Sequence, residues 1–188
     1  MKPTDALKNE HRIILSVLDA AEQEAGRIIT GGKIHEITIR QMLDFFKNFA
    51  DRCHHAKEEN IFFKKMVERG FPSDSGPIRV MLLEHEEGRD HVKNIEQNLS
   101  RALAHDANSL TGVAESLTSY VKLLREHISK EDNVLYPMAD NIFTPNDQKE
   151  LYNSFEQVER KEMGDGVHEK YHALALELTK GDAHNKKH

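Results

Sequence analysis

The sequence predicts an all-α protein: an antiparallel up-down-up-down four-helix bundle with an additional C-terminal helical segment. Apolar residues recur at helical spacing along most of the chain, and the alternation typical of strands is absent. Glycine and proline divide the chain into four long segments with short connections, which favours antiparallel neighbours. We therefore expect the bundle over residues 1–143, a helical extension packed on it over 144–181, and a flexible tail over 182–188.

The ends of the predicted helices are marked by capping residues, glycine and proline. Thr144 followed by Pro145 predicts the cap and first position of a fifth helix. Pro137 predicts a kink near the end of the fourth helix. Gly164 and Gly166 predict a break within the extension. The predicted helices cover residues 4–30, 36–69, 77–104, 108–141 and 144–179, the last one interrupted by that break.

The composition excludes several classes of protein. The net charge is −6, with both signs mixed along the chain, so no nucleic-acid partner is expected. No run of about 18 apolar residues occurs, and the first twelve residues lack the apolar region of a secretory signal. We therefore expect no membrane partner and a cytoplasmic location. The single cysteine, Cys53, excludes an intramolecular disulfide and is predicted to be a small buried residue.

The segment DRCHHAKEENIFF, residues 51–63, interrupts an apolar helical pattern with two histidines and two glutamates. His54 and Glu58 are four residues apart, so they share one helix face, and their neighbours on that face are core-type residues. His55 and Glu59 have a more polar set of neighbours and are predicted to point toward the flank. On this helical phase, His55→Ala should be a milder change than His54→Ala.

The fourth predicted helix repeats this pattern with His127 and Glu131, and His11 and His85 lie in the apolar seams of the first and third helices. A single histidine in such a seam is commonly a satisfied core residue. Burying four imidazoles and two carboxylates without partners, however, costs several kcal/mol. A pair of cations would offset that cost. Mixed imidazole and carboxylate ligation suits iron or manganese better than magnesium or calcium, and zinc is also compatible.

Four segments together resemble the signature segments of hemerythrin-like, HHE cation-binding proteins. They are LKNEH at 7–11, HHAKEE at 54–59, MLLEHEEGR at 81–89 and HISKEDNVLYP at 127–137, and the resemblance covers about residues 4–142. It implies a four-helix bundle around a centre of two non-haem iron ions. The implied ligands are His11, His54, His85 and His127, with Glu58 and Glu131 as bridging carboxylates.

One position departs from this pattern. Oxygen-carrying hemerythrins place a second histidine four residues after the one in the third helix, and here that position is Arg89. Gly88 leaves room beside His85. The centre could keep open positions, which suit redox chemistry better than reversible oxygen carriage. Otherwise a further ligand is needed, and the candidates are His168 or His172 of the extension, and His55 and Glu59.

The resemblance predicts a di-iron protein that binds or reacts with oxygen, peroxide or nitric oxide, in a sensing or stress-protective role. Catalase-like or other di-iron redox activity stays open at this point. Because the chain shows no second redox cofactor site, reducing equivalents would come from an electron-donor protein. The alternative within the di-iron class is iron sensing or iron supply.

Three further interpretations compete with the di-iron one. The string HEKYH at 168–172 matches the His-Glu-x-x-His pattern of zinc metalloproteases, but so short a motif occurs by chance. Ferritin-like iron oxidation is disfavoured, because those bundles use Glu before His at a different spacing. A metal-free helical interaction module could use Phe45, Phe46 and Phe49, although these residues are predicted to lie in the core.

Overall fold

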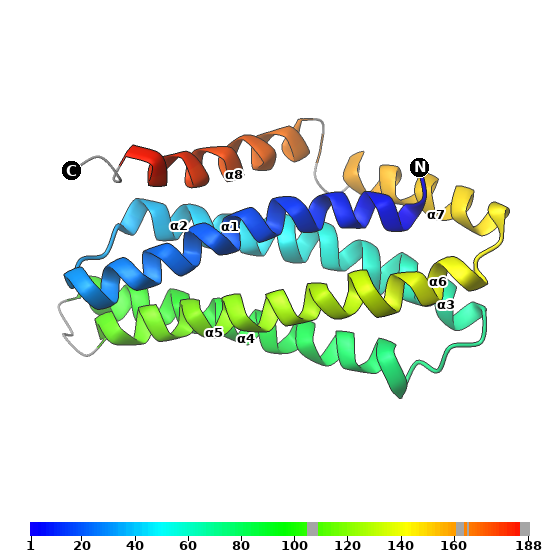
Figure 1. The fold of residues 1–188 in the computed structure, drawn as a ribbon, viewed down its shortest axis with the longest axis horizontal. Coiled ribbons are helices and arrows are strands. Elements are labelled where there is room, and N and C mark those ends of the chain that lie inside the picture. Colours follow the sequence, from blue (N-terminus) through cyan, green and yellow to red (C-terminus); the bar gives the residue numbers. More distant parts are fainter. Residues whose placement is uncertain (105–108, 161–163, 165, 185–188) are drawn as a thin grey trace.

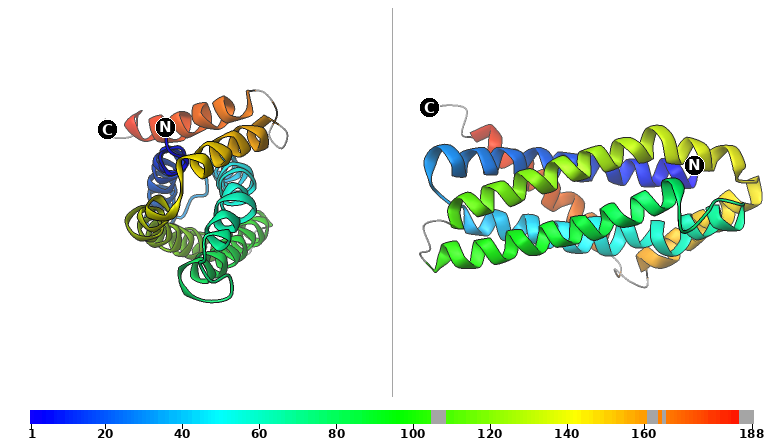
Figure 2. Two further views of the ribbon diagram at one scale, coloured as in Figure 1. Left: turned by 90° about the vertical axis from the view of Figure 1, so that its right-hand side faces the viewer. Right: turned by 90° about the horizontal axis from the view of Figure 1, so that it is seen from below.

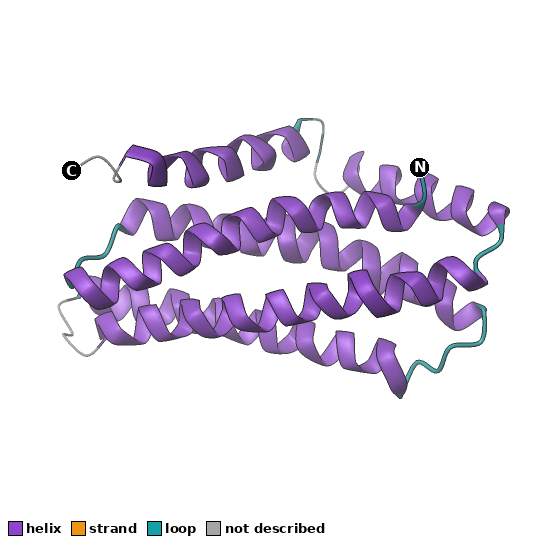
Figure 3. Cartoon of the chain, in the orientation of Figure 1, coloured by secondary structure: helices purple, strands orange, loops and turns teal. Residues whose placement is uncertain are grey.

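The computed structural model describes residues 1–104, 109–160, 164 and 166–184. Every regular element in this part of the chain is a helix, and loops join them (Figure 3). The prediction of an all-α protein is therefore confirmed. Asn108, where the fourth helix is predicted to begin, lies outside the described residues.

Before residue 143 the described chain forms four continuous helical rods (Figure 1). Successive rods reverse direction and are arranged around a common axis (Figure 2). Contacts join α1 to α5, α5 to α4, and α4 to the second rod. The rods are α1 (Pro3–Gly31); α2 (Glu36–Phe45), η1 (Phe46–His55), η2 (Glu58–Phe62) and α3 (Phe63–Glu68); α4 (Gly76–Leu103); and α5 (Ser109–Lys130), η3 (Glu131–Leu135) and α6 (Tyr136–Ile142).

Parts of the second and fourth rods are wound as π-helix, in the segments η1, η2 and η3. A π turn joins residues five apart, so it holds one residue more than an α turn and turns side chains through a different angle. Pro137 follows η3 closely and has no N–H to donate to the carbonyl of Asn133, which removes one α-helical bond from this stretch. These segments contain several of the predicted ligands, and the winding changes which of them face inward.

The apolar core is divided into two clusters by a polar layer. The larger cluster gathers residues such as Ile14, Phe46 and Leu124, and the smaller one gathers residues such as Leu7 and Phe62. Along each rod the predicted ligands lie between the residues of the two clusters. Apolar packing on both sides therefore holds the polar layer away from water.

The extension packs on the outside of the rods (Figure 1). Helix α7 (Pro145–Val158) begins as predicted, because Thr144 accepts a hydrogen bond from the backbone N–H of Asp147. Helix α8 (Val167–His184) lies against α1 and α2, and its Tyr171 is buried in the larger cluster.

The predicted break in the extension is confirmed. Gly164 and Gly166 have φ values of 80° and 82°, in the left-handed region that favours glycine. Helix α8 continues to His184, so it includes the first residues of the predicted tail, and residues 185–188 lie outside the described chain. Among the described helices, none combines the length and the apolar character needed to cross a membrane.

Candidate metal centre

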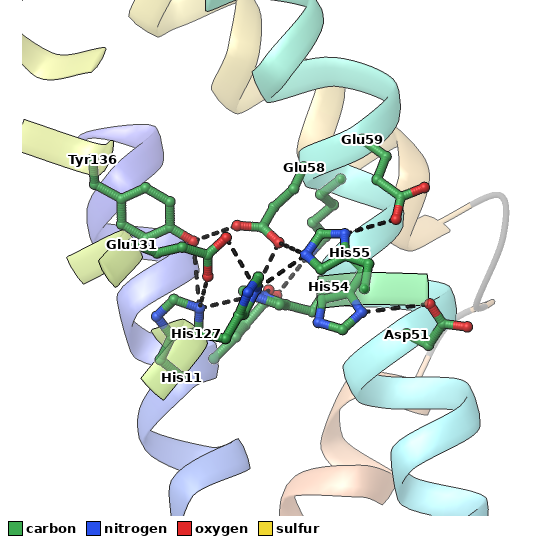
Figure 4. Close-up of polar contacts among 12 residues, drawn as sticks. His11, Asp51, His54, His55, Glu58, Glu59, His127, Glu131 and Tyr136 are labelled. Carbon is green, nitrogen blue, oxygen red and sulfur yellow. Dashed lines mark hydrogen bonds and ion pairs between the residues drawn. The ribbon is translucent and has the colours of Figure 1, made fainter. Parts of the chain in front are cut away.

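The polar layer brings all six predicted ligands together in the interior (Figure 4). Together with His55 they form two overlapping sets in which one ligand atom per residue lies within 4.8 Å of the others. Glu58 belongs to both sets. The first set, called here the His54 half, is His11, His54, Glu58 and Glu131; the second, the His55 half, is His55, Glu58, His85 and His127.

The prediction that His55 points toward the flank is wrong. Its side chain is buried, and its ring stacks on His85 with the ring centroids 3.9 Å apart. The reason is the π winding of η1, which ends at His55 and lets two consecutive histidines face the interior. The expected mildness of His55→Ala depended on α-helical phase and loses its basis.

Glu59 does point toward the flank, where it accepts a hydrogen bond from His85 Nδ1 at 2.7 Å. It therefore supports a candidate ligand and does not itself join either set of candidate ligands.

The inward nitrogens of the histidines converge in pairs. The Nε2 atoms of His11 and His54 are 2.9 Å apart, and those of His85 and His127 are 3.1 Å apart. Glu131 lies between the pairs, with one oxygen 3.2 Å from His11 Nε2 and the other 3.2 Å from His127 Nε2. The Glu131 carboxylate thus faces both halves of the centre.

The outward nitrogens of the same four histidines each meet a carboxylate at hydrogen-bond distance. These carboxylates fix the ring orientation and leave Nε2 directed at the centre, as the partners of metal-bound histidines do. The sequence analysis missed Glu10, Glu84 and Asp132, although each adjoins a predicted ligand on its own helix. The pairs are His11–Asp132 at 2.8 Å, His54–Glu10 at 2.8 Å, His85–Glu59 at 2.7 Å and His127–Glu84 at 3.0 Å.

Cations hold three of these carboxylates in turn. Lys57 contacts Glu10, Lys130 contacts Glu84, and Arg89 contacts Glu59. Arg89 also pairs at 2.8 Å with Asp51, which lies 3.4 Å from His55 Nδ1. Arg89 stands where oxygen-carrying hemerythrins have a histidine. It therefore supports two candidate ligands of the His55 half without being a ligand itself.

Tyr136 is a further residue of the centre that the sequence analysis missed. Its hydroxyl donates a hydrogen bond to Glu58 Oε1 at 2.6 Å and lies 3.4 Å from His11 Nε2. Burial, together with the negative charges of Glu131 and Glu58, raises the pKa of Tyr136 far above its usual value. The phenol therefore keeps its proton and holds one oxygen of Glu58 in place.

The charges of the centre depend on its carboxylates. Burial by itself lowers the pKa of His11, but its contacts with Asp132 and Glu131 outweigh burial and raise the pKa to about 9. Burial likewise lowers the pKa of His127, and Glu131 and Glu84 raise it to about 10. His127 and His11 in turn hold the pKa of Glu131 well below its usual value, against the effect of burial.

These residues fit a pair of metal ions. Both oxygens of Glu131 and Oε2 of Glu58 are buried and have no hydrogen-bond partner within the described chain, which is costly unless a cation meets them. Two nitrogens bound at right angles to one cation, each about 2.1 Å away, lie about 3 Å apart. The Nε2 pairs have this spacing. The donor set of imidazole and carboxylate suits iron, manganese or zinc.

A comparison with protein families agrees with this chemistry. A family described as the hemerythrin HHE cation binding domain matches residues 2–139. The chain belongs to this family. The match ends before α7, so it does not cover the extension.

Two groups of relatives illustrate the family's range. An uncharacterized protein of Mycobacterium tuberculosis (strain ATCC 25618 / H37Rv) is 20% identical over 163 residues, which are 87% of this chain and 63% of that protein. The iron-sulfur cluster repair protein YtfE of Escherichia coli (strain SMS-3-5 / SECEC) is 35% identical over 97 residues, 46% of this chain and 40% of YtfE. The chain thus spans less than two thirds of these relatives. No solved structure matches it.

The candidate ligands in the extension lie apart from the centre of the hemerythrin domain. His168 is half-buried, and its Nε2 lies 3.9 Å from Glu10 Oε1, while His172 is exposed and joins no candidate metal cluster of the described residues. In the cluster of Glu10, Glu159 and His168, both carboxylates already contact the ammonium of Lys57. The described extension therefore offers no assembled protease site.

Two other sequence predictions concern residues inside the hemerythrin domain. Phe45, Phe46 and Phe49 are buried in the larger cluster, so their predicted place in the core is confirmed. Cys53 is buried as predicted, and burial raises the pKa of its thiol to about 12. A thiol that stays protonated is a poor nucleophile and a poor metal ligand.

A cavity of about 150 Å³ adjoins the His55 half of the hemerythrin domain. Phe46, Gly88 and Tyr120 line it, His55 borders it, and Arg89 lies at its side. The absent side chain of Gly88 helps to keep this space open, because a Cβ there would lie 3.7 Å from Tyr120 Cε2. Asp51 and Arg89 line both this cavity and a second hollow, so the two adjoin each other.

Proposed function

We propose that this chain binds two non-haem iron ions in its polar layer and reacts there with a small oxidant: oxygen, peroxide or nitric oxide. We also interpret its rods as the antiparallel up-down-up-down four-helix bundle of the family. The observation that carries the proposal is the pair of overlapping ligand sets that share Glu58. Manganese and zinc are the other metals that this donor set would accept.

In this proposal each half of the centre holds one ion. His11 and His54 ligate the first, and His55, His85 and His127 ligate the second. A shared carboxylate joins the halves, since Glu58 belongs to both sets and Glu131 directs one oxygen to each side. This assignment adds His55 as a fifth histidine, in place of the one that Arg89 replaces.

A pair of bound irons supplies one-electron redox chemistry to a small oxidant. The chain's own residues prepare the surroundings for it. The two apolar clusters keep bulk water out of the polar layer. The carboxylates on Nδ1 hold the imidazoles of His11, His54, His85 and His127 in orientation, and Tyr136 keeps a proton on the hydrogen bond to Glu58 Oε1. The cavity beside His55 admits a molecule the size of oxygen, peroxide or nitric oxide.

Anaerobic reconstitution with ferrous iron tests this proposal. We expect two irons per chain by metal analysis, and rapid changes in the visible spectrum when the reduced protein is mixed with oxygen, peroxide or nitric oxide in separate stopped-flow experiments. A stable, reversible oxygen spectrum would indicate binding, and turnover of peroxide with oxygen release would indicate catalase-like activity. A protein that takes up no iron, or iron that none of the three oxidants alters, would contradict the proposal.

A second candidate function is iron supply to iron–sulfur proteins. It is favoured by the likeness to YtfE, which is named an iron-sulfur cluster repair protein and is 35% identical over 97 residues. The test is to mix the iron-loaded chain with an iron–sulfur protein whose cluster has been damaged. Recovery of the cluster faster than with the same amount of free ferrous iron would support this candidate, and equal rates would contradict it.

Either function needs partners that the described chain does not supply. We propose an electron-donor protein for repeated turnover, and we retain the cytoplasm as the predicted location. The test is to let the reduced iron centre react once with oxidant and then to add a cell extract and a reductant. If the iron is not reduced again, the proposed donor protein is contradicted.

A further inference from the structure

Lys57 is a buried lysine that the proposed reaction does not use. Its side chain is 2% exposed, and the residue lies between the π-helical segments η1 and η2 of the second rod. An ammonium group is almost never buried to this degree without partners. Lys57 has two: Glu10 of α1, and Glu159, which follows α7.

The contacts of Lys57 form a continuous line from the extension to the candidate centre. Glu159 contacts the ammonium, and the ammonium contacts Glu10 Oε1 at 2.5 Å. The other oxygen of Glu10 accepts a hydrogen bond from His54 Nδ1 at 2.8 Å. His54 Nε2 then faces His11 and Glu58 in the polar layer. Glu159 is partly exposed, and the other members of this line are buried.

The other half of the centre contains a matched arrangement that stops one step earlier. His127 Nδ1 meets Glu84, and Glu84 meets Lys130. The Lys130 side chain is 43% exposed, so water screens its charge, whereas no water reaches most of Lys57. Among the described residues, no second carboxylate contacts Lys130. The contacts through Lys57 therefore differ from those through Lys130 in two ways. Lys57 is buried, and a second carboxylate, that of Glu159, contacts it.

We propose that Glu159 is a positioning residue which, through Lys57 and Glu10, sets how strongly His54 donates to a cation at the centre. A carboxylate on the outward N–H of a histidine makes the inward nitrogen a better donor. Lys57 draws charge from Glu10 and weakens that effect, and Glu159 shares the ammonium and restores it. The extension thereby sets the strength of cation binding in the His54 half and leaves the His55 half unaffected. This inference rests on the proposed metal centre for its effect on bound metal.

The variant Glu159→Gln tests the inference, because it removes the charge and keeps the shape. The readout is the NMR resonance of the His54 Nδ1 proton, recorded in the metal-free and the zinc-loaded protein. We expect this resonance to move toward lower shift in both forms, as the hydrogen bond to Glu10 weakens. The resonance of the His127 Nδ1 proton should stay in place. Zinc affinity should fall about threefold, less than the roughly 10- to 100-fold change seen when a ligand's own partner is lost.

Glu156→Gln is the matched control, since Glu156 lies on α7, is exposed and pairs with Arg160. It removes the same charge nearby and should leave the His54 resonance unmoved. Lys57→Gln is the second variant and should move that resonance the opposite way, toward higher shift, because it removes the cation that draws charge from Glu10. An unmoved His54 resonance in Glu159→Gln, or equal shifts in Glu156→Gln, would overturn the inference. Failure to bind zinc or iron would instead contradict the proposed centre, while the metal-free spectra would still decide on the line of contacts.

Discussion

The two halves of the candidate centre use the same parts and are covered differently. In the His54 half the supporting lysine, Lys57, is buried beneath the extension. In the His55 half the supporting Arg89 is 32% exposed and borders a cavity. One half is thus covered by the extension, and the other half adjoins a cavity.

The largest expected effect comes from changing a residue that faces both halves of the centre. Glu131 faces both, so Glu131→Ala should abolish paired occupancy, and metal analysis after ferrous loading should find fewer than two irons per chain. Glu126→Ala is the control, because Glu126 is exposed on the neighbouring helix α5. If Glu131→Ala keeps two tightly bound irons, the shared role of Glu131 is wrong.

The next effect separates the halves. His54→Ala and His55→Ala should each cost one of the two ions, because each removes an imidazole from a different ligand set. Metal counting together with the spectrum of a cobalt-loaded protein would show which half is lost. A His55→Ala protein that binds both ions as tightly as the unaltered chain would show that His55 lines the centre without ligating.

The different fates of these two histidines show what the sequence could predict. The all-helical fold, the helix ends and the burial of His54, Glu58, His127 and Glu131 follow from period, caps and spacing. The inward position of His55 does not, because π winding arises from the combined demands of packing and backbone bonding along the rod. No pattern of residues marks it.

The supporting carboxylates were equally hard to predict from one sequence. Glu10 adjoins His11 but binds His54, and Glu84 adjoins His85 but binds His127. Each partner comes from another rod, so pairing depends on how the rods are rotated against each other. Spacing within one helix carries no information on that rotation.

A smaller effect is expected from the support of the His55 half. Arg89→Ala removes the cation that holds Glu59 and Asp51, and iron affinity should fall about 10-fold, at the lower end for supporting groups. Arg125→Ala is the control, since Arg125 also binds two carboxylates, Asp19 and Glu22, but touches no candidate ligand. Equal affinities in the two variants would argue against this support.

The smallest effect concerns the cavity. Gly88→Ala should slow the reaction of the reduced protein with oxygen severalfold, because the added methyl group narrows the space beside Tyr120. Gly26→Ala is the control, as a Cβ there meets nothing within 4 Å. Both variants should gain up to about 1 kcal/mol in the free energy of unfolding from helix propensity. A Gly88→Ala protein that reacts as fast as Gly26→Ala would mean that the oxidant takes another path.

The π-wound stretch that ends at His55 has a consequence for how such a site can change over generations. A π turn accommodates one additional amino acid while the helical faces before and after it keep their alignment. Inserting a single codon can thus add a histidine to the interior without repacking the rest of the rod. A donor nitrogen that the third rod does not supply at Arg89 can in this way come from the second rod.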